Sequence, residues 1–420
     1  MKPSFVTRGS RIRTLAALGL APIVLLFIFG LLSWRAAPAS LAQENPGASF
    51  LPVQLAPLPT PTVPAPTPTP GSPPQFVKNI SLPKAQCPNS AGFNRVSNIM
   101  YIANIYSDDL SIFQNQEYIT DISTGQWPRA IVSDPDSARS WVTAMHTGTE
   151  LLEGVTQIGM VPRDYEPYGI TFNPVNGYIY VTDLNGNIQV IDGDTLVKTI
   201  IVTDPVTGGT GGWILSVAVD PRTGLVYAPS WKYGRLYVID GTDVIDSVLL
   251  GVGPANMAFD DVRGLLYVAH SAPNELYPHD ISVVDVATLN VSFVDAFPGQ
   301  INQAEGIVVD VRSGLAYVTN PKHDNVTILD GTTIVGKVSV GKQPWGIGIN
   351  PNNGYVFVTN RESNDVSILL DGALVDTIKV QGVDPFSVGV DTNNNDIYII
   401  NRGEKVGNFE CKHESVSILH

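Results

Sequence analysis

The strongest constraint on the fold is a short sequence motif that occurs eight times in the chain. An aromatic residue opens each copy, as in YVTN from Tyr317 and FVTN from Phe357. Successive copies begin 40, 39, 47, 40, 50, 40 and 41 residues apart. A repeat period of this length indicates stacked supersecondary units. The opening residues are Tyr101, Trp141, Tyr180, Tyr227, Tyr267, Tyr317, Phe357 and Tyr398.

Each unit has the pattern of four short strands. In the sixth unit, β-branched stretches at 305–310, 315–320, 325–330 and 334–340 are separated by turn sequences such as VRSG and DGTT. Such alternation of β-branched runs and turn residues is typical of antiparallel hairpins. A single four-stranded sheet cannot bury both of its apolar faces, but radially arranged sheets cover one another. We therefore predict an all-β fold, a β-propeller of four-stranded blades.

The two ends of the repeat region predict how the ring closes. The eighth unit supplies three strands before the sequence ends at His420, and the segment 75–83 resembles the fourth strands of other units. We predict eight blades, with the N-terminal strand completing the last blade. Seven blades is the alternative, because the second unit is short.

The motifs YVTN, FVTN and YVTD, with NPxNG turns before them and DG turns after them, resemble the repeats of YVTN-family β-propellers. The resemblance covers residues 75–420 and implies a propeller fold and an extracytoplasmic location. It implies no particular chemistry, because a fold does not determine a function. The wider lactonase-like and NHL-like propeller group includes sugar-lactone hydrolases. We predict an exported, stalk-tethered binding module; the alternative is a lactonase- or lyase-like enzyme with its site in the central channel.

Residues 1–42 have the layout of an export signal. Basic residues at Lys2, Arg8, Arg11 and Arg13 precede an apolar run at 15–34 and a stretch of small residues. This pattern predicts a signal peptide cleaved near Ala39 or Ala42, or a retained membrane anchor. Both alternatives place the following residues outside the cytoplasm. Residues 43–74 are rich in proline and predict a disordered, extended linker that acts as a stalk.

The charge balance excludes nucleic acid as a partner. The formal net charge is −14, with 25 basic and 39 acidic residues. Five of the basic residues and no acidic residue lie in the first 35, which leaves 20 against 39, or −19, for the remainder. A surface of this sign repels polyanions.

The two cysteines, Cys87 and Cys411, predict a disulfide. Pairing is expected in an exported chain, whereas two free thiols would indicate a reducing compartment. Cys87 follows the N-terminal strand, and Cys411 lies in the loop between the second and third strands of the last blade. Both therefore lie at the seam of the ring and on one face, where a disulfide would tie the ring shut.

No motif for catalysis or for a cofactor stands out. The chain lacks a phosphate-binding loop, a haem-attachment motif and a nucleophile elbow, so we predict no cofactor and no catalytic residue. His146, His270, His323 and His413 all lie near loops on one face, but they belong to different blades, and we predict no metal site. The opening aromatics are expected in the core, and the fourth residue of each motif is expected to hydrogen-bond the following turn.

The candidate ligand site is the mouth of the central channel. The first residue of each innermost strand lies there, and these eight mouth residues differ strongly between units: Asn89, Arg129, Tyr168, Leu215, Ala255, Glu305, Trp345 and Phe386. In an eight-bladed ring, Arg129 would face Glu305 and Tyr168 would face Trp345. We predict that Arg129, Tyr168, Glu305, Trp345 and Phe386 bind a protein, peptide or polysaccharide ligand. The alternative is that these side chains only plug the channel.

Overall fold

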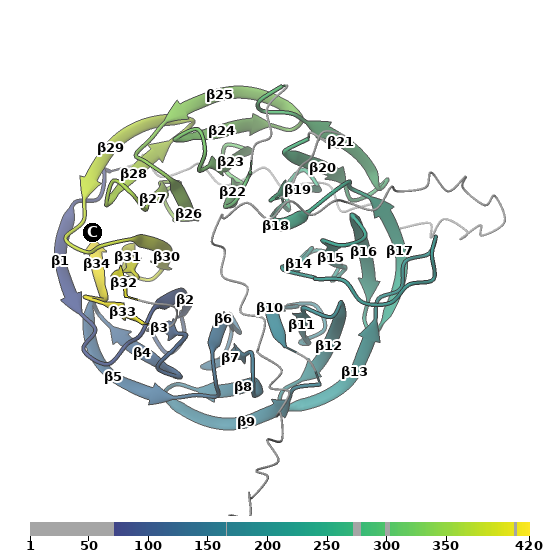
Figure 1. Ribbon diagram of the computed structural model, residues 1–420, viewed down its shortest axis with the longest axis horizontal. Helices are drawn as coiled ribbons and strands as arrows, with labels where there is room; N and C mark the ends of the chain where they lie inside the picture. Colours follow the sequence, from purple (N-terminus) through teal and green to yellow (C-terminus); the bar gives the residue numbers. More distant parts are fainter. Residues whose placement is uncertain (1–70, 165, 272–278, 299–302, 407–409) are drawn as a thin grey trace, which may run out of the picture. The chain divides into compact units, whose positions relative to one another are not determined.

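The computed structural model describes residues 71–164, 166–271, 279–298, 303–406 and 410–420. The predicted leader and most of the predicted linker lie outside these ranges. The elements of the described residues are strands (Figure 1). Within the described ranges, no helix is long and apolar enough to cross a membrane.

Eight four-stranded antiparallel sheets form a ring, with one strand of each sheet nearest the centre (Figure 1). The prediction of an eight-bladed β-propeller is confirmed, and the seven-bladed alternative is wrong. In the first seven blades the strands run outward in chain order from the innermost strand. Blade 1 consists of β2 (Pro88–Asn94), β3 (Ile99–Asn104), β4 (Asp109–Gln114) and β5 (Glu117–Ser123), and blade 2 of β6 (Pro128–Ser133), β7 (Arg139–Ala144), β8 (Gly148–Glu153) and β9 (Thr156–Pro162). Blade 3 consists of β10 (Pro167–Phe172), β11 (Ile179–Asp183), β12 (Asn187–Asp192) and β13 (Thr195–Ile201). Blade 4 consists of β14 (Ala218–Val219), β15 (Val226–Ser230), β16 (Arg235–Asp240) and β17 (Asp243–Leu249).

The next three blades repeat this order. Blade 5 consists of β18 (Pro254–Asp260), β19 (Leu265–His270), β20 (Ile281–Asp285) and β21 (Asn290–Val294). Blade 6 consists of β22 (Ile307–Asp310), β23 (Leu315–Asn320), β24 (Asn325–Asp330) and β25 (Thr333–Ser339). Blade 7 consists of β26 (Pro344–Ile349), β27 (Val356–Asn360), β28 (Asp365–Leu370) and β29 (Ala373–Lys379).

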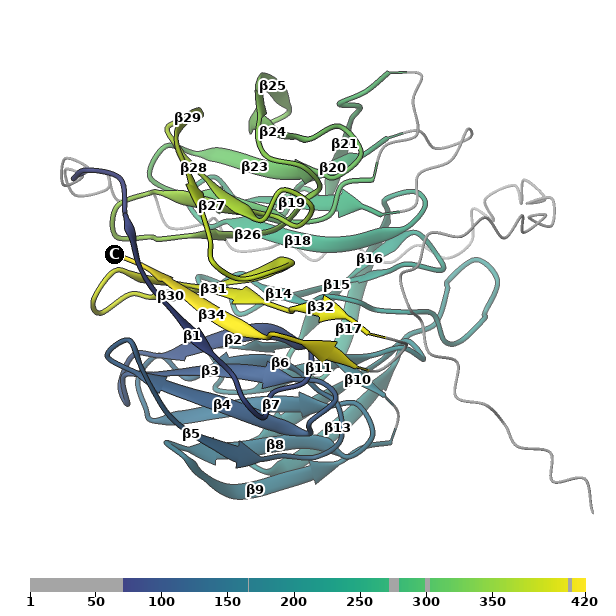
Figure 2. The ribbon, with the colours of Figure 1, turned by 60° about the vertical axis from the view of Figure 1, so that its left-hand side comes forward.

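The eighth blade joins the two ends of the described chain. Its order from the channel outward is β30 (Pro385–Asp391), β31 (Asp396–Asn401), β34 (Ser415–Leu419) and β1 (Phe76–Ser81). β1 and β34 run side by side in Figures 1 and 2, with Ile80 opposite Val416. Gln75 and His420 exchange backbone hydrogen bonds of 2.9 and 3.0 Å. The predicted closure by an N-terminal strand is therefore confirmed.

A disulfide joins Cys87 to Cys411 across this seam, with Cα atoms 5.3 Å apart. Cys87 lies between β1 and β2, and Cys411 begins β33 (Cys411–Lys412), which pairs with β32 (Glu404–Lys405) in the loop between β31 and β34. The predicted pairing is confirmed, and it adds a covalent link to the backbone pairing of the last blade.

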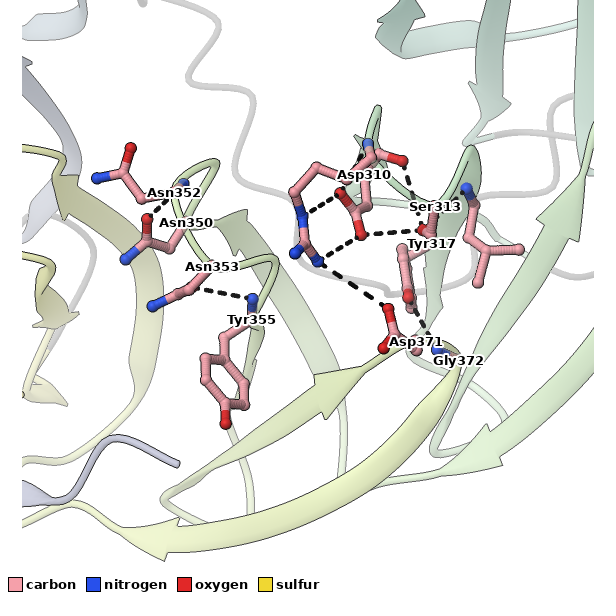
Figure 3. A network of polar contacts seen from close by, with 11 residues as sticks. Asp310, Ser313, Tyr317, Asn350, Asn352, Asn353, Tyr355, Asp371 and Gly372 are labelled. Carbon is pink, nitrogen blue, oxygen red and sulfur yellow. Dashed lines mark hydrogen bonds and ion pairs between the residues drawn. The ribbon is translucent and has the colours of Figure 1, made fainter. Parts of the chain in front are cut away.

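The aromatic residues that open the motifs lie in the core, as predicted, with exposed fractions between 0 and 3%. Five of them also reach the outermost turn of the following blade with a polar atom. The Tyr180 hydroxyl donates to the Gly241 carbonyl at 2.8 Å, and the Gly372 amide donates to the Tyr317 hydroxyl at 2.9 Å (Figure 3). The motif aromatic therefore fills the space between two blades and also fixes the register of one blade against the next.

The fourth residue of the motif stabilises the loop that follows it. The Asn360 side-chain amide donates to Asp365 at 2.8 Å and to Ser367 at 3.0 Å. Asn320 makes the same contacts with Asn325 and Thr327, both at 2.9 Å. The predicted structural role is confirmed, because these amides satisfy buried polar groups at the ends of the second and third strands.

Candidate functional site

A β-bulge places the mouth residues at the channel opening. In six blades the innermost strand begins with a proline that pairs regularly, and the ladder then slips before pairing resumes. Proline is tolerated at the first position of a strand, and a bulge turns the residue within it away from the regular pleat. The bulged mouth residues are Asn89, Arg129, Tyr168, Ala255, Trp345 and Phe386.

Hydrogen bonds from a neighbouring blade hold the backbone of several mouth residues, and in blades 6 and 7 the third residue of the motif makes them. The Thr319 hydroxyl accepts from the Gly306 amide at 2.8 Å and lies 3.1 Å from the Trp345 carbonyl oxygen. Thr359 lies 3.3 Å from the Phe386 carbonyl oxygen, and the Asn256 amide donates to the Glu305 carbonyl at 2.9 Å. These inter-blade hydrogen bonds fix the backbone of the mouth, whatever side chain it carries.

Three of the five predicted site residues line one pocket. Glu305, Trp345 and Phe386 border a hollow of about 280 Å³ on the channel side of β18, β22, β26 and β30. Asn256, Met257, Gly306, Ile307, Gly346, Ile347 and Ser387 complete its wall. The rings of Trp345 and Phe386 have centroids 6.0 Å apart and are tilted by 31°. The residues that border this open hollow thus include two aromatics, three aliphatic side chains and one carboxyl group, together with polar and glycine residues.

Glu305 is the buried acid of this pocket. The residue is 9% exposed, and burial raises the pKa of its carboxyl to about 7, although the nearby Arg361 guanidinium opposes the shift. A carboxyl group in this state is partly protonated at neutral pH. Among the described residues no ion pair reaches its carboxylate within 4 Å.

Arg361 and Arg402 approach the same two rings. Arg361 lies 5.0 Å from the Trp345 centroid and 5.2 Å from the Phe386 centroid, and it bonds both carboxylate oxygens of Asp384 at 2.6 and 3.0 Å. Arg402 lies 3.4 Å from the Phe386 centroid. Cations over aromatic faces are favourable contacts, so the two arginines and two rings form one cluster at the pocket rim.

Arg129 and Tyr168 form a separate pair. The Arg129 guanidinium lies 3.7 Å over the Tyr168 ring and hydrogen-bonds the Tyr168 hydroxyl. Their strands, β6 and β10, lie across the channel from β22 and β26 (Figure 1), so Arg129 faces the blade of Glu305 and Tyr168 faces the blade of Trp345. The predicted residues therefore divide into a pocket of three and a pair of two on the other side of the mouth.

Arg361 and Arg402 were not among the predicted site residues, although their position in the repeat could have identified them. Each directly follows the fourth residue of its motif, after Asn360 and Asn401. The amide of this fifth residue donates to a carbonyl two positions before the mouth residue in seven blades, as from Arg361 to Gln343 at 3.1 Å. The fifth residues thus form a second ring at the mouth: Ile105, Met145, Leu184, Trp231, Ser271, Pro321, Arg361 and Arg402.

The histidines of this face have structural partners. His270 is buried, and its ring nitrogens lie 2.8 Å from the Val252 carbonyl oxygen and 2.8 Å from the Ser282 hydroxyl. Burial lowers the pKa of His270 to about 4. The His323 ring stacks on Phe297 at 3.8 Å. In the described part of the chain, no three His, Cys, Asp or Glu residues are placed to hold a metal ion.

The fold and the site together define an eight-bladed β-propeller with an open pocket beside its innermost strands. A hydrazine synthase chain of Kuenenia stuttgartiensis has a similar structure, with a TM-score of 0.54 and 17% identity, over 68% of this chain and 96% of that one. At this identity the similarity supports the fold and no activity. No family model matches the chain, and no curated protein matches it either. The resemblance to YVTN repeats therefore stays a prediction.

Proposed function

We propose that the protein is an exported, stalk-tethered binding module that recognises a peptide, a protein or a polysaccharide outside the cytoplasm. The pocket of Glu305, Trp345 and Phe386 is the observation that carries this proposal. Concave sites with aromatic walls and a few polar groups are the usual form of ligand pockets. The repeated inter-blade hydrogen bonds supply a rigid frame, and the side chains that vary are the ones at the mouth.

Two features support the proposed location. The basic and apolar segment at 1–42 is the pattern of an export signal or anchor, and the proline-rich segment at 43–74 fits a stalk. The disulfide between Cys87 and Cys411 agrees with an oxidising compartment.

A direct test is to screen the full-length protein against peptide and polysaccharide arrays. Trp345→Ala should weaken binding of a retained ligand, because the ring forms one wall of the pocket. Phe293→Ala is the matched control, since Phe293 is 45% exposed on the outer strand β21. Hydrogen exchange should show protection of β22, β26 and β30 in the complex. Protection confined to the opposite face of the ring would overturn the proposal.

One observation favours an enzyme of the lactonase or lyase kind as a second candidate. A buried carboxyl with a pKa of about 7, such as that of Glu305, is suited to general acid–base catalysis at neutral pH. A panel of lactones and esters tests this candidate. Turnover that Glu305→Gln abolishes would favour the enzyme over the binding module.

A further inference from the structure

Two arginines at the channel mouth differ from the other half-buried arginines of the described chain. Arg222, Arg235, Arg312 and Arg361 each have an aspartate within 3.5 Å. Arg129 and Arg402 have no carboxylate within 4 Å among the described residues; their polar partners are Tyr168 and Asn89. This arrangement is unexpected in a chain with 39 acidic and 25 basic residues. Both guanidinium groups lie at the channel mouth, in blades 2 and 8, and the charge of Arg129 lowers the pKa of Arg402.

Arg402 also carries an unused donor. Its Nε atom is buried and has no hydrogen-bond partner among the described residues. One of its terminal nitrogens donates to Asn89, and the plane of the group lies against the Phe386 ring. Leaving a charged donor buried and unpaired is costly. The unpaired donor lies beside the Phe386 ring, which also lines the pocket.

The neighbouring charges increase this cost. Burial is the main cause that lowers the pKa of the Arg402 guanidinium to about 10, and the positive charges of Arg361 and Arg129 lower it further. Asp384 opposes this shift, but its carboxylate is already held by Arg361 through two hydrogen bonds. A further negative charge at this point would relieve the repulsion between three guanidinium groups.

We propose that the ligand of this site carries an oxyanion, a carboxylate or a phosphate, which Arg402 binds with help from Arg129, while its apolar part lies against Trp345 and Phe386. This inference rests on the proposed binding function and specifies its ligand class. Guanidinium groups bind carboxylate and phosphate oxygens through charge-assisted hydrogen bonds. The Phe386 ring connects the two parts, because Arg402 lies on it and it also lines the pocket.

The test uses simple probes on the full-length protein. Inorganic phosphate, benzoate and the neutral analogue benzyl alcohol are titrated at low ionic strength, and binding is followed by calorimetry and by tryptophan fluorescence. We expect millimolar or tighter binding of at least one anion. Loss of a charge-assisted hydrogen bond in Arg402→Met should weaken that binding by about tenfold or more. Tighter binding of benzoate assigns a carboxylate ligand, and tighter binding of phosphate assigns a phosphate ligand.

Matched variants distinguish the contribution of the arginine charge to binding from that of the apolar pocket. Arg95→Met removes an arginine from the turn between β2 and β3, at the opposite face, and should change nothing. Arg402→Lys keeps the positive charge and should retain part of the affinity. If Arg402→Met fails to fold, Arg129→Met with an unchanged melting temperature provides the same comparison. Failure of both anions to bind, or binding that neither arginine variant weakens, overturns the inference. If benzyl alcohol binds and is displaced by the array ligand while both anions fail, the binding function survives and only the anion inference falls.

Discussion

The disulfide across the seam should contribute more to stability than any other single feature of the fold. Replacing Cys87 and Cys411 with serine opens a loop that joins residues 324 positions apart. The chain-entropy relation gives about 6 kcal/mol at 25 °C for a loop of this length, and measured losses are commonly about 2 to 5 kcal/mol. For a folded unit of roughly 350 residues, we expect the melting temperature to fall by about 3 to 7 °C.

The assay compares the oxidised wild type, the reduced wild type and the double variant by thermal unfolding and by hydrogen exchange. Reductant should lower the melting temperature of the wild type to that of the double variant, and it should leave the double variant unchanged. Amides of β1 and β34 should exchange faster after reduction, because these strands close the ring, while those of β15 and β16 in blade 4 should change little. Equal melting temperatures for the oxidised and fully reduced wild type would refute this reasoning.

Three further predictions concern the mouth. Glu305→Gln should remove a pH dependence of the free energy of unfolding. The Glu305 carboxyl has a pKa of about 7 in the folded protein and of about 4.5 in the unfolded chain. The wild type should therefore lose stability as the pH rises from 4.5 through 7, by about 3 kcal/mol at most. Urea unfolding at pH 5 and pH 8 tests this, and identical pH slopes for both proteins contradict it. Thr319→Val removes the hydroxyl between Gly306 and Trp345 and should lower the free energy of unfolding by about 1 kcal/mol; an unchanged urea midpoint would argue against the role assigned to the motif threonine. Gly346→Ala would place a methyl group onto the Phe386 carbonyl oxygen and 2.8 Å from the Thr359 hydroxyl, and should cost about 1 to 3 kcal/mol; a variant as stable as the wild type would show that neighbouring blades can separate at no cost.

The fold could be predicted because the same pattern of strands and turns recurs eight times around the aromatic motif. Every blade has a buried aromatic at the start of the motif, and most blades add a polar side chain that reaches the next blade or holds the following loop. Tyr317, Thr319 and Asn320 have these roles in blade 6. Agreement among copies removes the ambiguity that a single short strand would leave. Closure was predictable for the same reason, since the strand missing from the eighth unit could be recognised before the first.

The site was only partly predictable, because side-chain direction at the mouth depends on the bulge. Alignment of the units identified Glu305, Trp345 and Phe386, but regular strand alternation does not predict that they face a common pocket. It also does not predict that Arg129 stacks on Tyr168 of the next blade. A bulged residue leaves the alternation of the pleat, so its neighbours follow from the three-dimensional path of two adjoining blades.

Arg361 and Arg402 show how the repeat itself separates structure from function. The backbone of the fifth residue is used in the same way in seven blades, and this backbone role does not depend on the side chain. In blades 7 and 8 this position places two arginines beside the aromatic wall of the pocket. Positions that share a backbone role and differ in chemistry are therefore where a propeller of this kind can acquire a ligand. The fourth residue has less freedom to change, because in blades 6 and 7 its side chain holds the loop that follows it.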